Sequence, residues 1–233
     1  MAVPWRRVDR ASPEYPGGLQ ELTRPPDELF VSGHSLARVT PQRTVAIVGT
    51  RDASEYGVRV ATQLATAFSR AGAVVVSGLA RGIDAAAHRG AMDAGGHTVA
   101  VLGTGVDVPY PASHRTLHAR VAEQGTVLSE MEPGTTAKPG CFPRRNRLIA
   151  SMAAMTIVVE APFKSGAINT ASQALDLGRT VAAVPGQIDS VRSAGANQLL
   201  RDGAQVISSI ADALGLLGLA EEPHPHAISA EQR

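Results

Sequence analysis

The stretch that decides the fold is Thr44–Arg51, which reads Thr-Val-Ala-Ile-Val-Gly-Thr-Arg. Its first five residues are β-branched or apolar, which is typical of a strand buried on both faces of a sheet. Gly49 then favours a turn, and the spacing of apolar residues predicts an amphipathic helix over residues 55–70. A buried strand that leads into a helix is half of a βαβ unit, so the stretch predicts a parallel sheet.

The same alternation of strand and helix continues toward the C-terminus. Further strands are predicted at residues 73–77, 98–102, 126–129, 156–160 and 180–184. Helices are predicted at residues 83–94, 143–152, 166–177, 197–202 and 208–217, and another helix is predicted from a cap at Ser113 to Glu123. The pattern predicts an α/β fold, an extended Rossmann-like and doubly wound, mostly parallel sheet with helices on both faces. We expect residues 44–218 to form this domain, residues 1–43 an N-terminal extension packing on it, and residues 219–233 a disordered tail.

Composition limits the classes of function. The chain has 233 residues, 44% of them hydrophobic, a net charge of +1 and one cysteine, Cys141. A lone cysteine excludes an internal disulfide and a cysteine-only metal site, and we expect neither metal nor cofactor. The sequence lacks an apolar run of about 18 residues and the apolar stretch of a signal peptide, so we expect a cytoplasmic protein without a membrane partner.

Glycine-rich segments follow several of the predicted strands. In a parallel sheet these segments meet at one rim, where such folds bind ligands. Glycine lets backbone amides approach a phosphate, and the next helix N-terminus adds partial positive charge. The phosphate-loop candidates are Gly49, Thr50, Gly78, Arg81, Gly103 and Lys164. Each glycine alone indicates an ordinary turn, but their coincidence on one edge favours a phosphate-bearing ligand.

A second basic segment, Lys138–Arg147, reads Lys-Pro-Gly-Cys-Phe-Pro-Arg-Arg-Asn-Arg. Cations that neutralise phosphates beside a ring that stacks a base are typical of a single-stranded nucleic-acid surface. A solvated basic loop explains the segment equally well when it is taken alone.

Two common nucleotide-binding motifs are absent from the sequence. The first strand is followed by Gly49-Thr50-Arg51-Asp52-Ala53-Ser54, which is not G-x-G-x-x-G, and no Gly-Lys-Ser/Thr of a Walker A motif occurs. These absences argue against a dehydrogenase and a motor ATPase.

The titratable side chains also favour structural roles over catalysis. Asp84 and His88, four residues apart, are expected to form a local hydrogen-bonded pair that braces a helix start, rather than a metal or acid–base site. Glu130 and Glu132 are expected to order Arg144 or Arg147 by charge pairing. No catalytic residue is predicted.

Several motifs occur in a characteristic order. They are Tyr15-Pro16, Pro25–Phe30, Val45–Arg51, Ser77–His88, Leu102–Asp107, Tyr110-Pro111, Phe142–Arg147, Ser165-Gly166, Val184–Gly186 and Gly195–Leu200. The series spans nearly all of Tyr15 to Leu217 and resembles the DNA-processing protein A (DprA, also called Smf) family of bacterial natural transformation.

The resemblance implies an extended Rossmann domain that binds single-stranded DNA in a basic pocket and is not an enzyme. It also implies that the protein protects incoming DNA, helps load the RecA recombinase and forms a homodimer. Arg51 resembles the phosphate-clamping arginine, Phe142 the stacking aromatic and Lys138 a pocket lysine. The neighbours expected in the pocket are Arg145, Asn146, Ser165 and Gly166. Many family members carry a helical module before the position of Tyr15 and a winged helix after the main domain, so functions of such modules stay open here.

Two alternatives remain. The fold also resembles LOG-type (lysine-decarboxylase-like) nucleotide phosphoribohydrolases, whose Pro-Gly-Gly-x-Gly-Thr-x-x-Glu helix start carries a hydrolytic glutamate. The corresponding segment here, Lys164–Ser172, has no glutamate. The other alternative is a scaffold that interacts only with proteins, which predicts no affinity for oligonucleotides.

Overall fold

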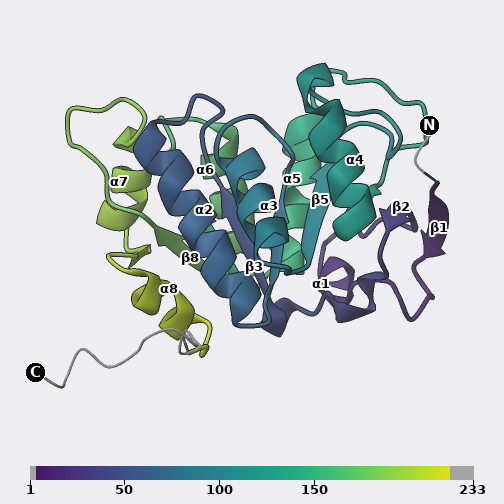
Figure 1. Ribbon diagram of the computed structural model, residues 1–233, viewed down its shortest axis with the longest axis horizontal. Coiled ribbons are helices and arrows are strands. Elements are labelled where there is room, and N and C mark those ends of the chain that lie inside the picture. The colour runs from purple at the N-terminus through teal and green to yellow at the C-terminus, as the bar shows by residue number, and fades with distance from the viewer. Residues whose placement is uncertain (1–3, 221–233) are drawn as a thin grey trace, which may run out of the picture.

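The computed structural model describes residues 4–220, so most of the tail predicted at residues 219–233 lies outside the described residues. Nine strands form one sheet in the order β1-β2-β6-β5-β4-β3-β7-β8-β9. All neighbouring strands from β6 to β9 pair in parallel, whereas β1–β2 and β2–β6 are antiparallel. Helices cover the sheet on both sides (Figure 1). The predicted α/β, mostly parallel, doubly wound fold is confirmed.

The strands are short and their central members are fully buried. Their bounds are β1 Arg6–Asp9, β2 Glu28–Gly33, β3 Thr44–Val48, β4 Val74–Ser77, β5 Thr98–Leu102, β6 Thr126–Ser129, β7 Met155–Val158, β8 Thr180–Ala183 and β9 Gln205–Val206. Within β3, Val45 and Ile47 pack on one side of the sheet, and Ala46 and Val48 pack on the other. The continuous apolar run therefore reflects burial on both faces.

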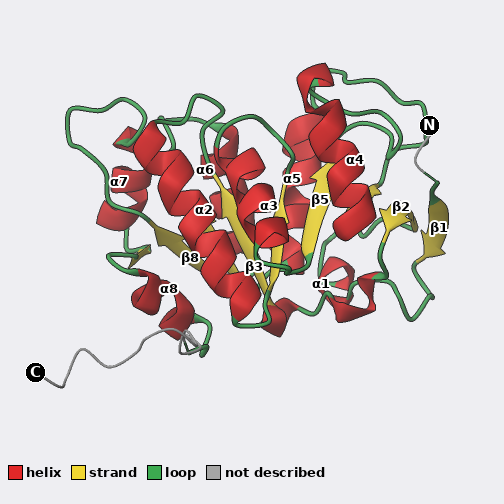
Figure 2. Cartoon of the chain, in the orientation of Figure 1, coloured by secondary structure: helices red, strands yellow, loops and turns green. Residues whose placement is uncertain are grey.

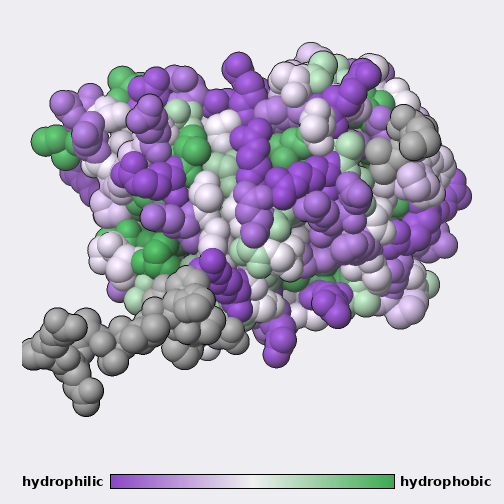
Figure 3. All heavy atoms as spheres, viewed as in Figure 1, coloured by the Kyte–Doolittle hydropathy of each residue, from purple (hydrophilic) through white to green (hydrophobic). Residues whose placement is uncertain are grey.

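Two sets of helices supply the layers. The front layer of Figure 1 contains α2 Glu55–Arg70, α3 Ile83–Asp93, α4 Arg115–Gln124 and α8 Ile210–Leu216. The other layer contains α1 Gly17–Gln20, α5 Cys141–Met152, α6 Gly166–Asp176 and α7 Ala194–Arg201. Single 3-10 turns span Leu36–Arg38, Pro41–Arg43 and Ala112–His114. Hydrophilic side chains predominate on the face that carries α2, α3 and α4 (Figure 3). No helix among the described residues is long and apolar enough to cross a membrane.

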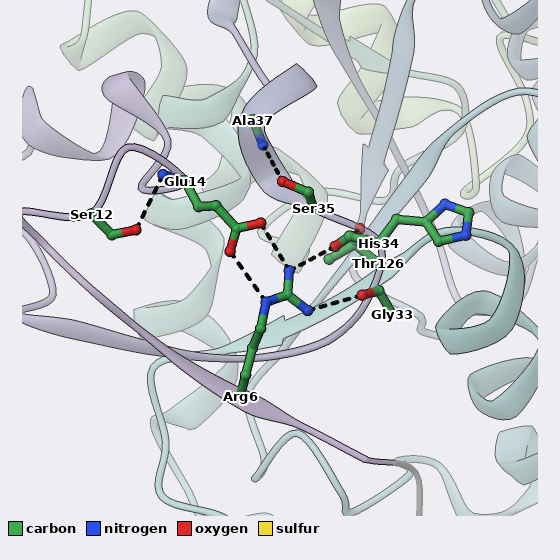
Figure 4. A network of polar contacts seen from close by, with 8 residues as sticks. All are labelled: Arg6, Ser12, Glu14, Gly33, His34, Ser35, Ala37 and Thr126. Carbon is green, nitrogen blue, oxygen red and sulfur yellow. Dashed lines mark hydrogen bonds and ion pairs between the residues drawn. The ribbon is translucent and has the colours of Figure 1, made fainter.

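The N-terminal residues are tied to the sheet through Arg6 (Figure 4). Its guanidinium donates to both carboxylate oxygens of Glu14, at 3.1 and 3.2 Å, and to the carbonyls of Gly33 and His34, at 2.9 and 3.1 Å. The hydrogen bond from Arg6 is the main cause that lowers the pKa of Glu14. This network fastens the segment after β1 to the end of β2, whose partner strand is β6.

Several predicted helix starts differ from the structure: α5 begins at Cys141, α7 at Ala194 and α8 at Ile210, where residues 143, 197 and 208 were expected. Ser113 does not cap a helix, because residues 112–114 first form a 3-10 turn and α4 begins at Arg115. His114 occupies the cap position of α4 without a side-chain cap hydrogen bond. Its ring nitrogen Nδ1 lies 3.0 Å from the Leu79 carbonyl instead, which ties this loop to the loop after β4.

Candidate functional site

The strand order reverses between β3 and β7, so the loops after these two strands diverge to opposite sides of the sheet. Figure 2 shows the strands, in yellow, between the helices. A switch point of this kind leaves a crevice at the carboxyl ends of the strands. A pocket of about 280 Å³ lies there. Its lining comprises Val48, Gly49, Thr50, Arg51, Ala80, Asp84, Phe142, Arg145, Asn146, Ile149, Ser165, Gly166, Ala167 and Thr170. The structure thus brings most of the predicted site residues to one place.

Arg51 and Phe142 face each other across this pocket. The Arg51 guanidinium carbon is 5.3 Å from the centre of the Phe142 ring, which is a cation–π contact. Arg51 is exposed and follows β3, whereas Phe142 lies in the first turn of α5. The loop after β4 packs against Arg51, because a Cβ on Gly82 would lie 2.3 Å from the Thr50 carbonyl oxygen. Gly82 also has a φ of +72°, so both the close contact and the backbone conformation require glycine at this turn.

Arg145 forms the floor of the pocket rather than an exposed clamp. It is only 6% exposed, and its guanidinium donates to the Val101 carbonyl at 2.5 Å and to Asn146 Oδ1 at 3.2 Å. A Cβ on Gly78 would lie 2.0 Å from Nη1, so only glycine leaves room for this side chain. Burial lowers the pKa of Arg145 to about 10, which still keeps it charged at neutral pH.

Asp84 and His88 brace the loop after β4, but not as the mutual pair expected from their spacing. Asp84 Oδ2 accepts from the amides of Gly78 and Ala80 at 3.1 and 3.3 Å, and His88 Nε2 accepts from Leu79 at 3.3 Å. The expected pairing is therefore wrong, since each side chain binds the backbone of residues 78–80. Burial raises the pKa of Asp84, although the charge of Arg145 opposes this shift, and burial lowers the pKa of His88 to about 3.

Asn146 joins α5 to the beginning of α6. Its Nδ2 donates to the Gly166 carbonyl and to Asn169 Oδ1, both at 3.1 Å. Ser165 caps α6 by accepting from the Ile168 amide at 3.4 Å. The N-terminus of α6 therefore borders the same pocket as Arg51, and its partial positive charge adds to that of the guanidinium.

The N-terminus of α2, in contrast, is already occupied by a carboxylate. Glu160 is 4% exposed and accepts from the Ser54 amide at 2.9 Å and from the Ser54 hydroxyl at 2.5 Å. In dinucleotide-binding Rossmann domains, the pyrophosphate lies at the helix N-terminus after the first parallel strand. Here the carboxylate of Glu160 fills that place, which agrees with the missing G-x-G-x-x-G.

A second pocket, of about 240 Å³, adjoins the first and shares the wall formed by Arg51, Phe142 and Arg145. Its other lining residues are Gly78, Ala80, Arg81, Tyr110, Pro111 and Ser113. The rings of Tyr110 and Phe142 are 5.0 Å apart between centroids, at an angle of 35°. Tyr110 and Ser113 were not predicted as site residues, although the Tyr110-Pro111 motif was a signal for this loop.

Three predicted residues line neither pocket among the described residues. Lys138 and Lys164 are exposed on neighbouring loops, and Gly103 lies behind Phe142, where a Cβ would be 3.1 Å from Cδ1 of the ring. The predicted charge pairing is confirmed for Glu130, which contacts Arg144 at 3.1 Å and also Arg147, whereas Glu132 pairs with neither arginine among the described residues. Within residues 4–220, no group of three or more His, Cys, Asp or Glu is placed to hold a metal ion.

The sequence matches the family DNA recombination-mediator protein A over residues 6–218. A protein of Mycobacterium tuberculosis is 47% identical over 197 residues, which are 82% of this chain and 50% of that relative. The chain spans about half the length of the curated relatives that it matches first.

Two solved structures share the fold closely. The crystal structure of DNA processing protein A from Streptococcus pneumoniae has a TM-score of 0.85 and 36% identity, and covers 94% of this chain and 75% of its own. The protein of the same name from Helicobacter pylori has a TM-score of 0.83 and 29% identity, and covers 93% of this chain and 98% of its own. The H. pylori structure was described for its single-stranded DNA binding mode.

Proposed function

The chain belongs to the DNA recombination-mediator protein A family, and from this premise we propose that it binds single-stranded DNA along the rim between β3 and β7. The observation that carries the proposal is the contact of an exposed guanidinium, Arg51, with an aromatic ring, Phe142, at 5.3 Å in the rim pocket. A phosphate needs the cation and a neighbouring base needs the ring, so the pair provides both contacts of one nucleotide unit.

The phosphates would lie between Arg51 and the first turn of α6. The guanidinium would supply charge-assisted hydrogen bonds, and the first turn of α6, with Gly166 and Ala167, lines the same pocket. Gly49 and Thr50 bring the backbone close on the opposite wall. Lys138 and Lys164, both exposed, would add attraction for the phosphates outside the pocket.

Single strands are favoured over duplexes by the role of Phe142. A base that stacks on this ring must be free of its neighbours, and in a duplex the bases are already stacked on one another. Stacking on an aromatic side chain contributes roughly 1–3 kcal/mol per base. The preference for unpaired DNA therefore arises from the ring, whereas the cations attract either form.

The proposal is tested by comparing one oligonucleotide in single- and double-stranded form. We expect tighter binding of the single strand, with a log–log salt dependence of about −0.7 per phosphate neutralised. Fluorescence anisotropy over a range of salt concentrations measures both quantities. Equal affinity for the two forms would contradict the proposed single-strand preference, and no binding at moderate salt would favour a scaffold that interacts only with proteins.

Replacement of Phe142 by alanine isolates the stacking contribution. We expect Phe142→Ala to lower the affinity for single strands by about tenfold, since roughly 1.4 kcal/mol of stacking is lost. Duplex affinity should change little, because no duplex base uses the ring. Anisotropy titrations with both DNA forms, next to a thermal unfolding curve of the variant, provide the measurement. Unchanged single-strand affinity would remove Phe142 from the interface.

We further propose that the site binds without catalysis. The first two turns of α6 contain no glutamate at the place where LOG-type hydrolases carry theirs, and Glu160 is committed to Ser54. Asp84 is likewise committed to backbone amides. Incubation with nucleoside monophosphates tests the alternative, because release of free base at enzyme-like rates would overturn the non-enzymatic role.

Membership of this family also supports a proposal for the cellular role of the protein. In the cytoplasm the protein would protect incoming single strands during natural transformation and help to load the RecA recombinase onto them. It would act as a homodimer, for which the half-buried Leu199 and Leu200 of α7 and the exposed Leu216 of α8 offer apolar surface. Light scattering at micromolar concentration distinguishes a dimer from a monomer.

A further inference from the structure

We propose that Tyr110 is a second base-stacking residue and that the pocket beside it, bounded by Arg51, Arg81 and Ser113, is a nucleobase subsite next to Phe142. This inference rests on the proposed binding of single-stranded DNA and extends it. It assigns a second base contact and a direction in which the strand leaves the rim pocket.

The ring of Phe142 has two close neighbours. Its ring is half-buried and already has Arg51 at 5.3 Å and the ring of Tyr110 at 5.0 Å. Tyr110 is 39% exposed, so it offers more ring surface to a ligand than Phe142 does. Because the two rings are neighbours, tilted by 35° to each other, a base stacked on Tyr110 would lie next to a base that contacts Phe142.

The pocket beside Tyr110 is lined by positively charged side chains. Three arginines line it, Arg51, Arg81 and Arg145, and no aspartate or glutamate of the described chain does. The amides of Gly78 and Ala80 are already bound by Asp84, so the polar groups left for a ligand include the guanidinium groups of Arg51 and Arg81 and the Ser113 hydroxyl. An aromatic face with cations and a hydroxyl at its edge suits a base with its attached phosphate.

The loop that carries Tyr110 is held in place without a ligand. His114 is close to the Leu79 carbonyl, at 3.0 Å from Nδ1, and the Thr104 hydroxyl donates to the Val108 carbonyl at 2.7 Å. These bonds fix both sides of the loop that carries Tyr110. A side chain fixed in advance loses less conformational entropy when a base binds.

The Tyr110 hydroxyl has no hydrogen-bond partner among the described residues, and its ring contacts that of Phe142. Tyr56 provides a matched control. It is also 39% exposed, and its ring centre lies 5.6 Å from the Arg59 guanidinium carbon, but it lies at the start of α2 outside both pockets.

The experiment measures the affinity of the wild-type protein and four variants for one single-stranded oligonucleotide. We expect Tyr110→Ala to lower the affinity about tenfold. Tyr110→Leu, which keeps an apolar contact with Phe142 but loses the aromatic face, should lose a similar factor, Tyr110→Phe should stay within about twofold of wild type, and Tyr56→Ala should bind like wild type. Wild-type affinity in both Tyr110→Ala and Tyr110→Leu would overturn the subsite.

A scan of the oligonucleotide with single abasic positions tests whether Tyr110 meets a base directly. The wild-type protein should bind less tightly when the abasic site occupies particular positions. In Tyr110→Leu, one of these positions should no longer affect the affinity, and it should differ from the position that no longer affects the affinity of Phe142→Ala. Identical scans for wild type and Tyr110→Leu would overturn the inference alone. Failure of the wild-type protein to bind any oligonucleotide would instead overturn the proposed function, so the two failures are distinguishable.

Discussion

Arg51→Ala is expected to lower the affinity for single-stranded DNA by tenfold or more while leaving the free energy of unfolding nearly unchanged. Arg51 is exposed and lines both rim pockets, so its guanidinium can bind phosphate on either side of Phe142. Loss of one charge-assisted contact alone corresponds to about 1.5–3 kcal/mol, or more than tenfold in affinity. The fold does not depend on this side chain, because its contacts lie at the surface.

Arg59→Ala is the matched control for this prediction. Arg59 is also exposed and also lies over an aromatic ring, at 5.6 Å from the centre of Tyr56, but on α2 outside the rim pockets. Both variants remove one positive charge, so a general electrostatic effect would weaken them equally. Anisotropy titrations at one salt concentration separate the cases. Equal losses in the two variants would show that Arg51 acts only through net charge, and no loss in Arg51→Ala would exclude it from the site.

The central fold and the location of the site follow from local sequence patterns. The predicted bounds of β3, β5, β6 and α2 agree with the structure residue for residue. Apolar runs there end at glycine or serine, so burial and turn chemistry indicate the same boundary. The convergence of Arg51 with Phe142 follows from the topology, because the loops after parallel strands share one rim.

The role of Arg145 could not be predicted in the same way. The basic segment from Lys138 was interpreted as a surface cluster, but Cys141 begins a helix. Helical spacing turns Arg145 inward on the face of Ile149, whereas Arg144 stays exposed. Its burial depends on the Val101 carbonyl and on the absence of a side chain at Gly78, which are distant in sequence.

The N-terminal strands and the contact of Tyr110 were missed for related reasons. β1 has only one buried residue, Val8, so no alternating pattern identifies a strand, and its position is set by pairing with β2. Tyr110 meets Phe142 across 32 positions of sequence, through two separate loops of the rim. Such contacts are created by the assembled sheet and not by local propensity.

Stability should fall in acid because His88 is buried in its neutral form. Nε2 accepts a hydrogen bond from the Leu79 amide, so the ring proton is on Nδ1, next to Thr98 Oγ1 at 2.7 Å, and the Thr98 hydroxyl donates to the Val75 carbonyl. A second proton would confront the Leu79 amide with another donor. Burial therefore lowers the pKa of His88 to about 3, below an ordinary value near 6.5.

The direction of the pH effect follows from which state binds the proton. Between about pH 6.5 and pH 3 the unfolded chain protonates His88 and the folded chain does not, so falling pH favours unfolding. At pH 5 this single group is expected to cost about 2 kcal/mol relative to pH 7.5. His97, whose pKa burial lowers to about 4, adds a contribution of the same sign, so wild type alone does not isolate His88.

The contribution of His88 is isolated by comparing how much stability wild type and a His88 variant each lose between the two pH values. Urea unfolding of wild type and His88→Gln at pH 7.5 and pH 5.0 gives two losses of stability, and the loss in His88→Gln should be smaller by about 2 kcal/mol. His97→Gln, as a parallel variant, should retain the His88 contribution. The comparison remains valid even if His88→Gln is less stable at both pH values, because each protein serves as its own reference. Equal losses in wild type and His88→Gln would mean that His88 is protonated in the folded state. The loop at residues 78–80, which borders both rim pockets, would then lack the bond to His88 that holds it in place.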